Sequence, residues 1–164
     1  MYELSLVRPA VAVNVCWMEN ADRSLPLPTY ATDGAAAMDV RANFSTLAER
    51  GEGVSIAPGG RALIPTGLRM EIPVGYELQV RPRSGLALKS GVTLANSPGT
   101  IDSDYRGEVG IIVLNVGQDT FQINHGDRVA QLVFAPVSRL QWVEVDAIGE
   151  TERGEQGFGS TGVE

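Results

Sequence analysis

Short apolar or alternating stretches, separated by Gly, Pro, Asn and Asp, recur along most of this chain. Runs of four to eight such residues predict strands, and closely spaced breakers are typical of a β-sandwich or jelly roll. We therefore expect an all-β fold, with a monomeric β-barrel as the alternative that the pattern leaves open. The predicted strands are Val11–Cys16, Ala37–Ala42, Val54–Ile56, Arg61–Ile64, Leu68–Ile72, Tyr76–Val80, Gly110–Val116, Thr120–Ile123 and Val129–Phe134.

One segment, Ser84–Ser90, departs from the strand pattern and predicts the one short helix of the chain. Ser84 is a favourable N-cap residue, Leu86–Lys89 are good helix formers, and Gly91 can end the helix. A helix that begins after Arg83 would present unpaired backbone N–H groups to phosphate oxygens. A capped connecting helix without a ligand would use the same residues.

The most informative polar residues lie between two apolar runs, Gly91–Ala95 and Val109–Leu114, which predict a β-hairpin. The intervening Asn96–Glu108 contains a Pro-Gly turn signal, two carboxylates, an aromatic ring and a cation. Because side chains alternate along a strand, Asp102 and Asp104 would share a face. A carboxylate beside an apolar neighbour can act as a general base for water, whereas Asp-Ser-Asp taken alone is an ordinary solvated turn.

Composition favours one compact domain over residues 1–150, since 43% of the 164 residues are hydrophobic. Residues 151–164 are rich in Gly and polar residues, so we expect a flexible C-terminal segment there. The chain has a single cysteine, Cys16, and a single histidine, His125. These numbers exclude an intrachain disulfide and leave the common Cys/His metal-site patterns unfilled.

Charge and the N-terminal residues limit the partners and the location that we expect. A formal net charge of −7 disfavours a broad nucleic-acid surface, because phosphate neutralisation needs clustered Lys and Arg. A small anionic ligand needs only a few of the 13 basic residues. Met1–Arg8 has neither the order of a signal peptide nor the length of a membrane span. We expect a cytoplasmic protein without nucleic-acid or membrane partners.

Five segments in order resemble the five motifs of the trimeric dUTPase family, the deoxyuridine 5′-triphosphate nucleotidohydrolases. The resemblance implies a jelly-roll homotrimer with active sites at its subunit interfaces. It also implies hydrolysis of dUTP to dUMP and pyrophosphate, which keeps uracil out of DNA and supplies dUMP for thymidylate synthesis. The five segments are Ala31–Ala42, Arg81–Ala87, Asn96–Glu108, Gly126–Leu132 and Arg153–Gly162.

The resemblance also assigns roles to individual residues. Asp102 would deprotonate the water that attacks the α-phosphorus, and Asp39 would hold Mg²⁺ on the triphosphate through water. Asn96 would read uracil with backbone groups of the hairpin, and Tyr105 would pack on the deoxyribose and exclude a 2′-hydroxyl. Residues implied to contact the phosphates are Arg83, Ser84, Gly85, Gln131, Arg153, Ser160 and Thr161. Phe158 and Gly159 belong to the tail, which would close as a lid and stack Phe158 on the uracil.

Some residues near these motifs have simpler explanations. Gln131 alone would be an ordinary outward-facing residue of a strand. Arg128 is interpreted as structural, and His125 lies in a turn and receives no catalytic role. Three other functions remain open: a dCTP deaminase or bifunctional deaminase-dUTPase of the same fold, a dUTP-sensing regulatory protein, and a catalytically silent jelly-roll assembly protein.

Overall fold

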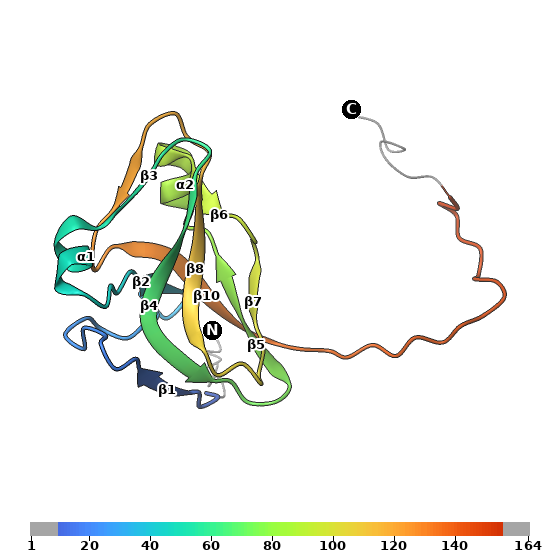
Figure 1. Ribbon diagram of the computed structural model, residues 1–164. Coiled ribbons are helices and arrows are strands. Elements are labelled where there is room, and N and C mark those ends of the chain that lie inside the picture. The colour runs from blue at the N-terminus through green and yellow to red at the C-terminus, as the bar shows by residue number, and fades with distance from the viewer. Residues whose placement is uncertain (1–9, 156–164) are drawn as a thin grey trace, which may run out of the picture.

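The computed structural model describes residues 10–155 (Figure 1). Two short helices, α1 (Leu47–Glu52) and α2 (Ser84–Ser90), accompany ten strands in these residues. The strands are β1 (Asn14–Trp17), β2 (Met38–Arg41), β3 (Val54–Ile56), β4 (Arg61–Glu71), β5 (Tyr76–Arg81), β6 (Val92–Leu94), β7 (Gly99–Ile101), β8 (Glu108–Asn115), β9 (Phe121–Ile123) and β10 (Arg128–Pro136). The all-β class expected from the sequence is therefore confirmed.

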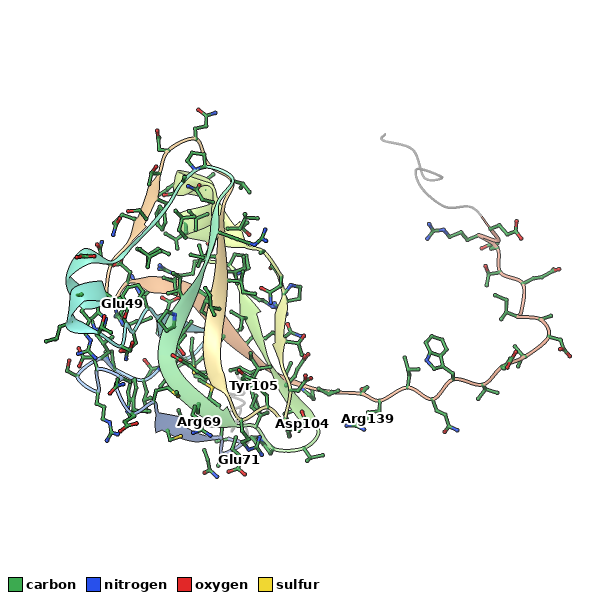
Figure 2. The ribbon with its side chains drawn as sticks, viewed as in Figure 1. Glu49, Arg69, Glu71, Asp104, Tyr105 and Arg139 are labelled. Carbon is green, nitrogen blue, oxygen red and sulfur yellow. The ribbon has the colours of Figure 1, made fainter. Side chains whose placement is uncertain are left out.

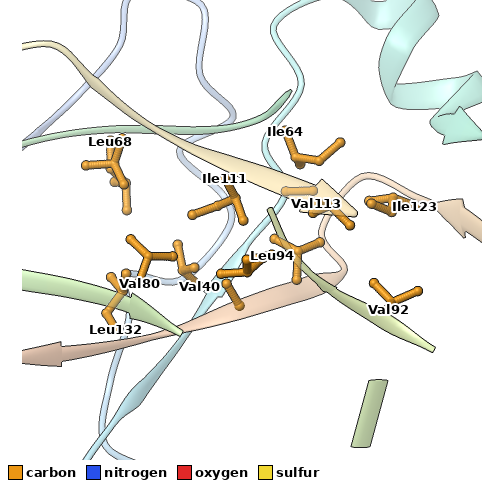
Figure 3. Packing of buried hydrophobic residues seen from close by; sticks show 14 of the residues in the cluster. Val40, Ile64, Leu68, Val80, Val92, Leu94, Ile111, Val113, Ile123 and Leu132 are labelled. Atoms are coloured by element: carbon orange, nitrogen blue, oxygen red, sulfur yellow. The ribbon is translucent and has the colours of Figure 1, made fainter. Parts of the chain in front are cut away.

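The strands form two four-stranded sheets, with orders β1-β4-β8-β6 and β2-β10-β5-β7, and a small β3-β9 sheet. All strand pairs within these sheets are antiparallel. Burial alternates strictly along β8, so one face of that strand points into the core. Figure 3 shows side chains of both large sheets meeting in this core, among them Ile64 and Ile111 from one sheet and Val40 and Leu132 from the other.

The strand β4 joins two segments that the sequence predicts as separate strands. Its pairing with β8 shifts register between Pro65 and Arg69, and Gly67 there has a φ of +68°. The positive φ favours glycine, because an L side chain is strained in that region. The Gly67 N–H donates to Glu108 Oε1 at 2.8 Å. A bulge therefore replaces the predicted break, and the strand continues.

The predicted hairpin needs a correction. Its two arms do pair as β6 and β8, but the residues between them do not form a simple turn. Instead β7 crosses to the other large sheet and pairs with β5, with Val80 opposite Gly99 and Leu78 opposite Ile101. Because β7 ends at Ile101, Asp102 and Asp104 lie in a turn, and the strand-alternation argument for a shared face does not apply to them.

The expectation of a single helix was wrong, and one detail of the predicted helix also changes. In α2 the N-cap residue is Arg83, without a side-chain cap bond, so Ser84 is the first helical residue; Gly91 ends the helix in the left-handed region, as expected. The helix α1 has no buried residue, so it leaves no apolar periodicity in the sequence. Its one signal is the capping box formed by Thr46 and Glu49.

The imidazole of His125 joins three loops through its two ring nitrogens. The Phe44 N–H donates to His125 Nδ1 at 3.1 Å, and His125 Nε2 lies 3.1 Å from Asp22 Oδ2. Since a backbone N–H can only donate, Nδ1 accepts and Nε2 carries the hydrogen that faces Asp22. Asn43 binds the same loop, accepting from the Asp22 N–H and donating to the Asp22 carbonyl. His125 is thus a structural residue, in agreement with the absence of a catalytic role in the sequence interpretation.

Beyond β10 the chain leaves the sheets as a long arm, which we define as residues 137–155 (Figure 1). No strand or helix forms in these residues. Several of its apolar side chains are strongly exposed, with Leu140 at 68%, Trp142 at 88% and Ile148 at 89%. Within residues 10–155, neither helix is long and apolar enough to cross a membrane.

Candidate functional site

Three of the predicted site residues meet on the sheet that contains β2, β10 and β5. Gln131 of β10 lies opposite Asp39 on one side and opposite Arg81 on the other. Its side-chain amide donates to the Pro82 carbonyl at 2.8 Å, next to Arg83. Arg83 Nε lies 3.1 Å from Asp39 Oδ1. Ser84 and Gly85 follow at the exposed start of α2, so four of the residues predicted to contact phosphates, Arg83, Ser84, Gly85 and Gln131, lie near the Arg81 end of β5.

Asp39 is held by two guanidinium groups. Arg83 contacts one carboxylate oxygen, and Arg128 Nη1 lies 3.0 Å from the other. The Asp39 side chain is 33% exposed, so solvent screens both pairs. Arg128 also accepts a hydrogen bond at its carbonyl from Arg83 Nη1, at 2.8 Å. The interpretation of Arg128 as structural stays a prediction, since its half-exposed side chain also lines an open cavity.

The donor set around Asp39 limits how it could bind a metal. Across residues 10–155, no three His, Cys, Asp or Glu side chains gather in a metal-binding group. Magnesium ordinarily keeps several waters and uses one or two carboxylates together with substrate phosphates. A lone carboxylate beside a phosphate site fits that mode. Direct chelation by the protein alone does not fit it.

Asp102 and Tyr105 lie in the turn between β7 and β8. The Tyr105 N–H donates to the Asp102 carbonyl at 3.2 Å, and the Tyr105 hydroxyl donates to the Glu108 carbonyl at 2.9 Å. Gly107 is required beneath the ring, since a Cβ there would lie 2.6 Å from Tyr105 Cζ. The Asp102 side chain is exposed, and Tyr105 is 44% exposed. Both side chains are therefore accessible to a ligand.

The two groups of residues lie far apart within one chain. Because Ile101 pairs with Leu78, Asp102 follows at the Glu77 end of β5, whereas Ser84 follows Arg81 at the other end. Four residues of strand separate these levels by roughly 13 Å. Figure 1 shows α2 and the β7–β8 turn at opposite ends of the molecule. A single chain therefore does not bring the predicted base next to the predicted phosphate residues.

Asn96 lies between these extremes. It precedes β7, and its side-chain nitrogen would lie 3.1 Å from a Cβ built on Gly99. Gly99 in turn pairs with Val80, near the end of β5 that leads to α2. Asn96 and Asp102 thus lie beyond the two ends of β7. A nucleobase that contacts both ends would lie along this strand.

Two open cavities adjoin the phosphate-side residues. One of about 300 Å³ is lined by Arg41, Arg83 and Arg128 together with apolar residues. The other, of about 570 Å³, lies beside Gln131 and Pro82. A third cavity of about 850 Å³ is mostly apolar and lies next to the β1 and β2 edges, between residues such as Val13, Leu27 and Met38.

The predicted tail residues are only partly described. Arg153 lies in a turn near the end of the arm. The predicted residues Phe158, Gly159, Ser160 and Thr161 lie outside the described residues.

Comparison with known proteins decides which family this arrangement represents. The dUTPase family model matches residues 23–162. The chain belongs to the dUTPase family. The matched range contains the five segments singled out in the sequence, so the expected family is confirmed.

Bacterial relatives agree with this dUTPase assignment. The chain is 57% identical over 153 residues to the deoxyuridine 5′-triphosphate nucleotidohydrolase of Roseobacter denitrificans, covering 93% of this chain and 97% of the relative. It is 52% identical over 152 residues to the enzyme of the same name from Desulfotalea psychrophila, covering 92% and 97%.

Solved structures of dUTPases share the fold. The dUTPase of Staphylococcus bacteriophage 80alpha with dUPNHPP has a TM-score of 0.78 at 25% identity, covering 94% of this chain and all of that chain. A mutant dUTPase from phage phi11 of S. aureus, which coordinates a structural Mg(II) ion, has a TM-score of 0.69 at 23% identity, covering 84% and 98%.

Proposed function

We propose that this chain hydrolyses dUTP to dUMP and pyrophosphate, with Asp102 as the general base. The reaction follows from the family, since relatives more than 50% identical over most of the chain are deoxyuridine 5′-triphosphate nucleotidohydrolases. The chain is therefore a nucleotidohydrolase that acts on the bond between the α- and β-phosphates. The dUMP that it forms can supply thymidylate synthesis while uracil is kept out of DNA.

We propose that three copies of the chain build each site. The observation that carries this proposal is the separation of Asp102 from Ser84 at opposite ends of β5. A neighbouring copy that places its Asp102 turn against α2 and Asp39 would complete the site. The exposed Trp142 and Ile148 of the arm support the assembly, because exposed apolar side chains of this size usually pack against a partner.

In this site, water attacks the α-phosphorus in line while Asp102 accepts its proton. Arg83, Ser84, Gly85 and Gln131 would bind the phosphates and stabilise the spreading negative charge. Mg²⁺ on the triphosphate would neutralise part of that charge, with Asp39 as its outer-shell carboxylate. Pyrophosphate leaves from the opposite side of the phosphorus.

Base and sugar selection would come from the other end of the site. Uracil offers an acceptor at O4 and a donor at N3, and cytosine reverses both. If backbone groups and Asn96 satisfy uracil, cytosine leaves unpaired buried groups that cost about 1–3 kcal/mol each. Tyr105 would lie against the deoxyribose and exclude a 2′-hydroxyl. Arg153, Phe158, Gly159, Ser160 and Thr161 would close over the nucleotide as a lid, with residues 1–150 as the domain beneath it.

The proposed location is the cytoplasm. The free Cys16 is exposed, which suits a reducing compartment. The prediction that neither nucleic acid nor a membrane is a partner stays a prediction from the net charge of −7 and the sequence pattern.

The test measures pyrophosphate release from dUTP, with dCTP, dTTP and UTP in parallel, for the intact chain and for Asp102→Asn. We expect selective turnover of dUTP that falls by about 100- to 10,000-fold in Asp102→Asn, the usual contribution of a general base. Turnover of dUTP that survives in Asp102→Asn would reject the assigned base. Ammonia release from dCTP would instead indicate a deaminase of the same fold.

A further inference from the structure

The half-exposed guanidinium of Arg106 lies against the turn that carries Asp102 and Tyr105. Its Nη1 donates to two carbonyl oxygens of the turn, to Ser103 at 2.7 Å and to Tyr105 at 3.0 Å. Hydrogen bonds from a charged donor are stronger than those between neutral groups. One side chain thus binds the backbone on both sides of Asp104.

The hydrogen bonds of the β-sheets do not fix the conformation of this turn. Residues 102–107 lie between the end of β7 and the start of β8 and belong to neither strand. The turn's own backbone hydrogen bond, from Tyr105 N–H to the Asp102 carbonyl, is long at 3.2 Å. The conformation of the turn, and with it the direction of the Asp102 side chain, therefore depends on side-chain contacts.

Arg106 also connects the turn to the strand β4. Its carbonyl accepts from Arg69 Nε at 2.8 Å, and its Nη2 lies 3.5 Å from Glu71 Oε1. The second Glu71 oxygen accepts from Asn14 of β1 at 2.8 Å. Figure 2 shows Arg69, Glu71 and Tyr105 grouped at this end of the molecule. The turn is thus bound to β4, and Glu71 of that strand also binds β1.

We propose that Arg106 is a positioning residue for the reaction: its guanidinium fixes the turn so that the Asp102 carboxylate meets the attacking water. The inference rests on the proposed role of Asp102 as the base. Arg106 itself does not touch the substrate in this arrangement. Its planar group can bind two carbonyls and a carboxylate at once, which a lysine ammonium on a flexible stem cannot reproduce.

The experiment compares Arg106→Ala and Arg106→Lys with the intact chain. We expect kcat for dUTP to fall about 10- to 100-fold in Arg106→Ala, because misplacement of a catalytic group by about 1 Å can cost about 100-fold. Affinity for a non-hydrolysable dUTP analogue should change less than about threefold, since the lost interaction acts on the chemical step. Arg106→Lys should recover only part of the loss.

Chemical rescue separates positioning from a general role in stability. Guanidinium chloride at millimolar concentration should restore part of kcat in Arg106→Ala, since the small cation can occupy the emptied turn, while equal sodium chloride should not. Asp102→Asn should show no rescue. The matched control is Arg61→Ala, which removes an exposed arginine at the other end of β4 and should keep the kcat of the intact chain.

Two results would overturn the inference. One is a kcat within about twofold of the intact chain in Arg106→Ala, beside an inactive Asp102→Asn. The other is a loss of analogue affinity in parallel with kcat and without guanidinium rescue, which a purely structural role would give. Full activity in Asp102→Asn would instead reject the proposed base, so the two failures are distinguishable.

Discussion

The Asp39 carboxylate is bound by Arg83, the arginine that we propose binds the phosphates of the substrate. Arg83 lies 3.1 Å from Asp39, and Arg128 binds the other carboxylate oxygen. A triphosphate that takes up Arg83 must therefore compete with Asp39. Release of the carboxylate in that exchange would make it available to the hydration shell of Mg²⁺ on the phosphates.

Asp39→Asn is expected to have opposite effects with and without Mg²⁺. In EDTA the variant should bind a non-hydrolysable dUTP analogue up to about fivefold more tightly, because the ion pair with Arg83, worth about 0.2–1 kcal/mol, no longer opposes binding. In Mg²⁺ it should bind more weakly and turn over dUTP more slowly. Titration calorimetry under both conditions measures the two affinities, and equal or weaker binding in EDTA would contradict the exchange.

At the scale of elements, the sequence allows most strands, one helix and one strand pair to be predicted, but not how the strands are arranged in sheets. The apolar runs mark β3 at its observed bounds and the arms β6 and β8 as a pair. The crossing of β7 to the other sheet was missed, because three residues of strand pattern do not specify which edge they join. The bulge at Gly67 was missed for a similar reason: a Pro-Thr-Gly sequence reads as a break.

For the candidate site too, the sequence identifies the residues but not where they lie in the fold. The motifs identify Asp39, Arg83 and Gln131, and the structure brings them together near the Arg81 end of β5. No pattern in the sequence could indicate that Asp102 lies at the far end of β5, since that depends on strand register. Arg106 looks like a solvated arginine in sequence, and only its bonds to the turn carbonyls distinguish it.

The contact between the Asp22 loop and His125 makes the stability of the fold depend on pH. The pKa of Asp22 is lowered to about 2, first by the hydrogen bonds from Ser24 and then by that from His125. Because the folded pKa lies below the ordinary value of 3.8, the carboxylate stabilises the fold above about pH 4, and this contribution disappears as pH falls towards 2. The lowered pKa thus ties the attachment of the loop to the ionised state of Asp22.

Asp22→Asn should lower the denaturation midpoint at pH 6, and the difference from the intact chain should shrink between pH 4 and pH 2.5. Urea titrations at several pH values measure it. Asp33→Asn, at an exposed aspartate, serves as the control and should show no comparable pH dependence. A difference between the chains that stays constant over this range would contradict the role of the charged Asp22.

At the scale of the whole molecule, the apolar arm is the feature that a solitary chain explains least. Trp142 at 88% exposure and Ile148 at 89% would remain in water without a partner. The mostly apolar cavity beside the β1 and β2 edges is a surface of matching character. Burial of such surface in an oligomer would stabilise the arm at roughly 25 cal/mol per Å².

Sedimentation of the intact chain should give about three times its mass of 17.5 kDa. Trp142→Glu should shift the equilibrium towards smaller species and reduce dUTP turnover at low protein concentration, since a charge replaces an apolar anchor. Ser138→Glu places the same charge on a neighbouring polar position of the arm and should sediment like the intact chain. A monomer at working concentration would reject the shared site.

The positions of Asp102 and Ser84 at opposite ends of β5 have a genetic consequence. If each site takes these residues from different copies, a cell that makes Asp102→Asn and Ser84→Ala chains together regains some intact sites, although each chain alone is inactive. A chain that carries both substitutions does the reverse: mixed with the wild type, it disables more than one site per assembly. Two defective alleles would therefore complement each other in part, and the double mutant would disable more sites of a mixed assembly than either single mutant does.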